Sequence, residues 1–140
     1  MWKYALTAFA GAAIGTVAGV FLDRLMRTLK ENRILKCTEL LEKEFGEPMY
    51  VNKFSFDEVN EWILQRKEKI TNGYKAVVLK VNKESFAKIS SDLVIEEDLN
   101  KYLLLAIYKD GVFEESLLVK YETLDEKLLE MLSDDIMVVE

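Results

Sequence analysis

The stretch 101-KYLLLAIYKDGVFEESLLVKY-121 decides the fold, because it encodes two β-strands joined by a tight turn. Residues 102–108 are apolar on both alternating faces, which is typical of a strand at the centre of a sheet. Asp110 and Gly111 favour a two-residue hairpin turn, and residues 112–121 return as the second strand. We expect the tyrosines of this hairpin to pack across the strands; they are Tyr102, Tyr108 and Tyr121.

A strand, a helix and a second strand precede the hairpin. Residues 48–54 form the first expected strand, and a capping box at 55–58 starts a helix that ends at Asn72-Gly73. The apolar face of this helix includes Trp62, which we assign to the core. Residues 74–82 show the two-residue period of another strand. A sixteen-residue helix between two strands predicts a crossover unit whose strands run parallel.

The remaining segments complete an α+β domain. We expect a short helix at residues 83–90, an acidic connection at 91–100, a capping box at 123–126 that starts a helix to about residue 132, and an edge strand at 136–139. This order of elements predicts a two-layer domain over residues 47–140, with a mixed sheet covered by helices on one face.

The N-terminal segment predicts a membrane anchor. Residues 4–22 carry no charge, and about twenty apolar residues in a helix span the hydrocarbon core of a bilayer. We therefore expect a transmembrane helix over 1–22 and a basic juxtamembrane stalk helix over 23–46. The excess of basic residues after the apolar stretch places the C-terminal domain in the cytoplasm, at a cell membrane that the chain crosses once. The expected membrane-interface residues are Trp2, Lys3, Tyr4, Arg24 and Arg27.

The glycines of this segment recur every four residues and extend a small-residue stripe that begins at Thr7. The residues Gly11, Gly15 and Gly19 would share one helix face, where a second helix could approach closely. The pattern resembles glycine-zipper anchors in general, a class too broad to imply a function. We expect this face to be the helix-packing site through which the chain forms a homo-oligomer.

Two other interpretations of the N-terminal segment remain open. The first is a cleaved signal peptide, for which Ala8-Phe9-Ala10 provides small residues at the spacing of a cleavage site. The basic residues directly after the apolar stretch disfavour export. The second is a water-soluble helix, rich in alanine and glycine, that docks on a partner protein.

Composition excludes several kinds of chemistry. The chain has one cysteine, Cys37, and no histidine, so it offers neither an intrachain disulfide nor a Ser-His or Cys-His pair. Its net charge of −6, concentrated in the C-terminal domain, argues against nucleic acid as a partner. The acidic cluster lacks the glycine and ligand spacing of a cation site, so we expect a solvated loop; its members are Asp92, Glu96, Glu97 and Asp98.

These observations favour a non-enzymatic protein without cofactor or metal. We expect a membrane-anchored cytoplasmic adaptor or assembly module that binds a protein partner and self-associates through its anchor helix. The alternatives are a small pore- or lesion-forming membrane protein, and a soluble interaction protein whose glycine-rich helix docks on a partner.

Overall fold

The computed structural model describes residues 12–34, 36–87 and 93–139 as an α+β fold built on a five-stranded mixed sheet. The strands are β1 (Met49–Phe54), β2 (Lys75–Lys80), β3 (Tyr102–Lys109), β4 (Val112–Leu124) and β5 (Ile136–Val139), in the spatial order β1-β4-β3-β2-β5. β1 runs parallel to β4, and the other three neighbouring pairs are antiparallel. The central position expected for the apolar strand β3 and the edge position expected for β5 are both confirmed.

The hairpin between β3 and β4 forms at the expected dipeptide. Asp110 and Gly111 have φ angles of 52° and 80°, the two positive values that a turn of the type I′ class requires. The crossover unit differs in detail. β1 and β2 run in the same direction, as expected, but β4 and β3 lie between them. β4 takes this place because the tight turn forces it to pair with β3.

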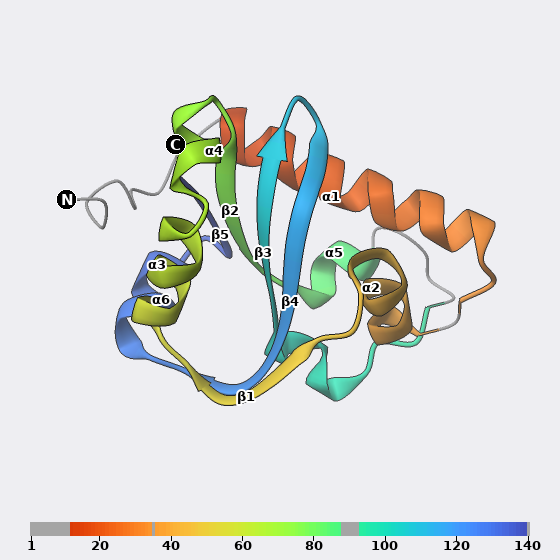
Figure 1. Ribbon diagram of the computed structural model, residues 1–140. Coiled ribbons are helices and arrows are strands. Elements are labelled where there is room, and N and C mark those ends of the chain that lie inside the picture. The colour runs from red at the N-terminus through yellow and green to blue at the C-terminus, as the bar shows by residue number, and fades with distance from the viewer. Residues whose placement is uncertain (1–11, 35, 88–92, 140) are drawn as a thin grey trace.

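Helices cover both faces of the sheet, so the expectation of helices on one face is wrong. α1 (Ala12–Glu31), α2 (Cys37–Phe45) and α5 (Lys83–Ala87) pack on one face, and α3 (Phe56–Leu64), α4 (Lys67–Thr71) and α6 (Glu126–Met131) pack on the other. Figure 1 shows α1 passing behind the strands, with α3 and α6 on the opposite side. The physical reason is visible in β3, whose apolar residues are buried on both faces and require two covering layers.

α1 belongs to the core of the domain over its described length. Val17, Phe21 and Leu25 are at most 3% exposed and pack with β2 and β3 in one apolar cluster. These residues recur every four positions, so they form a single helical stripe. A membrane span over 4–22 would have to remove Val17 and Phe21 from this cluster. Among the residues that the structure describes, no helix is long and apolar enough to cross a membrane.

The helix expected over 23–46 is interrupted. α1 ends at Glu31, and α2 begins at Cys37 and packs back against α1. Ion pairing holds the two helices together, since Arg24 Nε lies 2.5 Å from Glu44 Oε1. The polar residues Asn32 and Arg33 mark the break in the sequence. The segment is therefore a helical hairpin against the sheet and not a straight stalk.

Two short-range signals start the helices on the other face. Ser55 accepts a hydrogen bond from the Glu58 amide at 3.2 Å, which confirms the expected N-cap of α3. The second cap is shifted, because β4 continues through Leu124 and Asp125 caps α6 in place of Thr123. One Asp125 oxygen accepts from the Leu128 amide, and the other accepts from the Phe56 amide. A single carboxylate thus joins the starts of α3 and α6.

The long helix expected between β1 and β2 is divided. α3 ends at Leu64 and α4 begins at Lys67, with Arg66 in a non-helical conformation between them. Further along the chain, a 3₁₀ helix, η2 (Glu97–Lys101), occupies part of the acidic connection. The three hairpin tyrosines are each at most 6% exposed, so their expected packing role is confirmed.

Candidate functional site

The most exposed edge of the sheet is β1. This six-residue strand pairs with β4, and no other described strand pairs with its outer side. Met49 and Tyr50 are 41% and 69% exposed. An edge strand presents unpaired backbone N–H and C=O groups that can pair with another chain. The opposite edge, β5, has only four residues, and all of their side chains are buried.

An apolar groove of about 450 Å³ lies between β1 and α3. Strand residues form its floor and one wall, and the outward side of α3 forms the other wall. The groove exists because the helix uses Phe56, Val59 and Ile63 for the core, which leaves Trp62 half-buried beside the strand. Its lining residues are Met49, Val51, Phe54, Glu58, Glu61, Trp62, Gln65 and Leu117.

The rim of the groove is acidic. Glu58 and Glu61 project from α3, and both residues are exposed. Neither carboxylate forms an ion pair with any residue that the structure describes. The groove therefore combines an apolar surface with two negative charges that remain available to a partner.

Trp62 is held in place by Arg66. The Arg66 guanidinium carbon lies 3.8 Å from the centre of the Trp62 ring, and Nη1 donates a hydrogen bond to the Trp62 carbonyl at 2.9 Å. Stacking of a guanidinium on an indole ring is a favourable cation–π arrangement. The wall of the groove is consequently rigid at its largest side chain.

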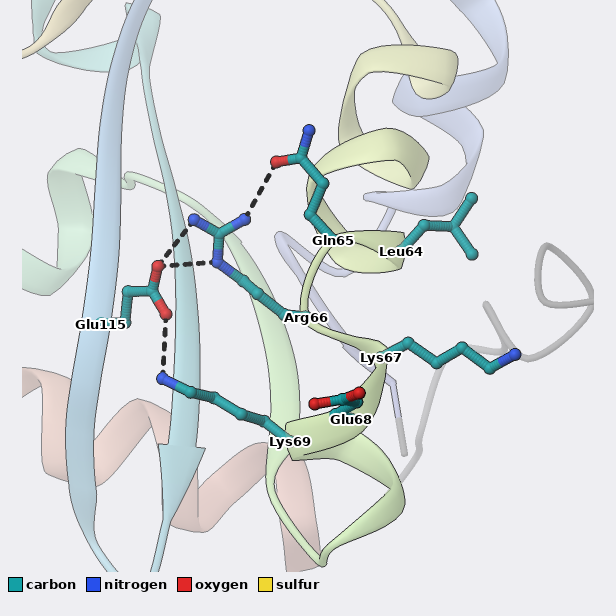
Figure 2. A pocket seen from close by; sticks show the side chains of 7 residues that line it. All are labelled: Leu64, Gln65, Arg66, Lys67, Glu68, Lys69 and Glu115. Carbon is teal, nitrogen blue, oxygen red and sulfur yellow. Dashed lines mark hydrogen bonds and ion pairs between the residues drawn. The ribbon is translucent and has the colours of Figure 1, made fainter.

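Gln65 lines the groove and also a polar pocket beside it. Figure 2 shows the side chains of this polar pocket. Arg66 and Lys69 point toward Glu115 on β4: Arg66 Nη2 lies 2.6 Å from Glu115 Oε1, and Lys69 Nζ lies 3.2 Å from Glu115 Oε2. Leu64 and Lys67 point away from Glu115. The hydrogen bond from Arg66 is the main reason that the pKa of Glu115 is below its usual value. Because the carboxylate satisfies both cations, this pocket serves to fix the junction of α3 and α4.

A smaller hollow of about 300 Å³ flanks the other side of β1, lined by Tyr50, Val51, Asn52, Lys120 and Glu122. The ammonium of Lys120 lies 5.9 Å from the Tyr50 ring centre and forms an ion pair with Asp98. That pair lowers the pKa of Asp98 and raises the pKa of Lys120. Met49 lines only the groove and Tyr50 only this hollow, as expected from the alternation of side chains along an extended chain, whereas Val51 borders both.

The structure places few of the expected site residues. Trp2, Lys3, Tyr4, Thr7 and Gly11 lie outside the described residues. Gly15 and Gly19 belong to α1, and a Cβ built on Gly19 meets no atom within 4 Å. Gly19 is thus on the side of α1 that faces away from the sheet. Arg24 pairs with Glu44, and Arg27 is exposed.

The acidic connection contains residues whose role the sequence did not reveal. Glu96 accepts hydrogen bonds from the amides of Cys37 and Thr38, at 3.1 and 3.3 Å, and so caps α2. The expectation of a solvated loop is therefore wrong for Glu96. Glu97 is exposed, and Asp98 pairs with Lys120 but keeps 42% of its side chain exposed; Asp92 lies outside the described residues. The sequence around Glu96 and Asp98 could not have indicated these contacts, because Thr38 lies 58 residues from Glu96 and Lys120 lies 22 residues from Asp98.

Cys37 and the carboxylates form no recognisable reactive centre in the part of the chain that the structure describes. Cys37 is fully buried, and burial, together with the nearby Glu96, raises the pKa of its thiol to about 11. No group of three or more potential metal ligands occurs among the described residues. The half-buried Trp62 was expected in the core, and it contacts the core while also lining the groove.

Comparison of the chain with protein-family models, with curated proteins and with solved structures found no match. The site must therefore be interpreted from its own geometry. It offers unpaired backbone groups, an apolar groove and an acidic rim. These are the components by which a sheet edge recognises an extended peptide.

Proposed function

We propose that this protein is an adaptor that binds an extended segment of a partner protein by strand addition to β1. The observation that carries the proposal is the open edge of β1 beside the apolar groove formed with α3. Main-chain hydrogen bonds along the edge would supply affinity, and the groove would select side chains at alternate positions.

The described contacts support a rigid docking surface. Arg66 fixes Trp62 on one wall, and Asp125 ties the first turn of α3 to α6. A preformed groove binds with less loss of conformational freedom than a loop that must first become ordered. Burial of Val17 and Phe21 gives α1 a structural role, which supports an adaptor over a pore-forming protein.

A cytoplasmic position at a membrane, with self-association through the glycine face of the N-terminal helix, accompanies this proposal as a hypothesis from the sequence. It is independent of the β1 site, because strand addition requires only the sheet edge. Fractionation of the full-length protein tests it. Recovery in the membrane fraction supports the hypothesis, and complete recovery in the soluble fraction contradicts it.

The binding proposal is tested by selecting peptides from a random library on the immobilised full-length protein. We expect selected peptides to slow amide hydrogen exchange over residues 49–54. We expect Met49→Gln to weaken their binding about tenfold, which corresponds to ~1.4 kcal/mol. Leu129→Gln on α6 is the matched control, since Leu129 is 46% exposed and does not line the groove. Peptides that bind both variants equally and leave β1 exchange unchanged would contradict the proposal.

A further inference from the structure

The proposed function leaves the chemistry of the bound segment open, and the following inference rests on that function. We infer that β1 recognises a basic, apolar segment: one with apolar side chains at two successive groove-side positions and Lys or Arg at the next groove-side position. The inference combines the two-residue period of a strand with the charge of the groove rim.

The alternation along β1 defines which ligand side chains meet the groove. Met49 and Val51 line the groove, whereas Tyr50 between them lines only the hollow on the other side, which Val51 also borders. A strand added to this edge continues the same alternation, so every second side chain of the ligand enters the groove side. These positions recur about every 6.6 Å, since a strand rises about 3.3 Å per residue.

The negative charge of the groove rim favours Lys or Arg at the ligand position that follows the two apolar ones. Glu58 and Glu61 are exposed beside the apolar floor, and neither forms an ion pair with a described residue. Arg66, at the junction of α3 and α4, and Lys69, on α4, are already paired with Glu115. A ligand carboxylate would meet repulsion here, whereas Lys or Arg would meet two unneutralised acceptors.

The same charges disfavour a second copy of this chain as the occupant. Edge-to-edge pairing of two β1 strands about a two-fold axis would bring the Glu58 and Glu61 carboxylates of both copies to one junction. The chain also carries a net charge of −6, which adds long-range repulsion between copies. A basic segment from another protein relieves both effects.

The test uses the full-length protein and synthetic ten-residue peptides. The first has Val at two groove-side positions, Lys at the next and Thr at the intervening positions; the second has Glu in place of Lys. Binding is measured by fluorescence anisotropy at low and high salt. We expect the Lys peptide to bind at least tenfold more tightly than the Glu peptide at low salt, with a smaller ratio at high salt.

A pair of double variants assigns the preference to the rim. Glu58→Gln with Glu61→Gln should reduce the Lys-over-Glu ratio below about threefold. The matched control, Glu126→Gln with Glu130→Gln, removes two exposed carboxylates from α6 and should leave the ratio unchanged. Both pairs include one residue in a first helical turn, so their effects on helix stability are comparable.

The outcomes separate this inference from the proposed function. Equal binding of both peptides, weakened equally by Met49→Gln, would overturn the basic preference and leave the β1 site standing. If neither peptide binds and β1 exchange stays unchanged, both proposals fail. A concentration-dependent dimer that Met49→Gln abolishes would identify a second copy as the occupant and overturn the inference.

Discussion

The rings of Phe21 and Phe45 stack with their centres 5.7 Å apart and their planes 9° from parallel. Phe45 also meets the edge of Phe113 on β4, at 6.2 Å. Phe21 lies on α1 and Phe45 at the end of α2, so this pair joins the two helices of the N-terminal hairpin. Through Phe113 the contact continues to the sheet. The N-terminal apolar helix is thus fastened to the domain by aromatic packing.

Removing the Phe21 ring should destabilise the whole fold. Phe21 is 3% exposed, and Phe→Ala changes at buried sites cost about 3–5 kcal/mol. We expect Phe21→Ala to lower the free energy of unfolding by that amount in urea titrations. Met26→Ala is the control, because Met26 is on the same helix and 37% exposed. Equal stability of the two variants would show that α1 does not pack on the sheet in solution.

Glu96 should stabilise α2 from a distance. Replacing it with Gln leaves a side chain of the same size but removes the negative charge that caps the Cys37 and Thr38 amides. We expect Glu96→Gln to lower the free energy of unfolding by about 1 kcal/mol, as for other lost caps and dipole contacts. The exposed neighbour variant, Glu97→Gln, should change it by less than ~0.5 kcal/mol. Identical urea midpoints for the two variants would argue against the cap.

The Arg66–Glu115 contact should contribute to acid sensitivity. The pKa of Glu115 is lowered from its ordinary value of 4.5, so its carboxylate stabilises the folded state above pH 4.5. This contribution is lost as the pH falls through the lowered folded-state pKa. We expect Glu115→Gln to reduce stability at pH 7 by up to ~1 kcal/mol, a modest value because the site is partly exposed.

Urea titrations at pH 7 and pH 3 measure this effect. The difference between the wild type and Glu115→Gln should shrink at the lower pH, because the stabilisation from this charge is lost progressively below the ordinary pKa of 4.5. Glu130→Gln, an exposed carboxylate on α6, should show little difference at either pH. A Glu115→Gln effect that is the same at both values would show that the charge is not responsible.

Cys37 should react slowly in the native protein. Its pKa of about 11 lowers the thiolate fraction at pH 8 about a hundredfold relative to an ordinary cysteine, and burial restricts access further. We expect labelling by a thiol-reactive disulfide reagent to become at least a hundredfold faster in 8 M urea. Phe21→Ala should increase the native rate because it raises the unfolded population. Similar rates with and without urea would contradict the burial of this thiol.

Patterns among neighbouring residues were enough to predict the elements whose interactions lie within a few residues in the chain. The Asp110-Gly111 turn, the alternation of residues 102–108 and the Ser55 cap each depend on neighbours in the chain, and each forms as expected. The groove was not predictable in this way. Trp62 sits on the apolar side of α3, and only the position of β1 next to β4 leaves it beside an open strand.

The break at Arg66 was missed for a similar reason. Helical periodicity continues through residues 56–71, and the local sequence contains no proline or glycine to end the helix there. Arg66 leaves the helical conformation where its side chain reaches Glu115, which lies 49 residues away in the chain. Pairing between distant charges is outside the reach of a local pattern.

By itself the sequence determined the apolar stripes, the turn, the first cap, and the content of strands and helices, because these follow from backbone geometry and side-chain spacing over a few residues. Only the tertiary structure decided what the stripes touch. Burial of the apolar stripe formed by Val17, Phe21 and Leu25 is favourable, and either lipid tails or the face of a sheet would shield it from water. Here β2 and β3 expose a second apolar face that needs covering, and α1 covers it.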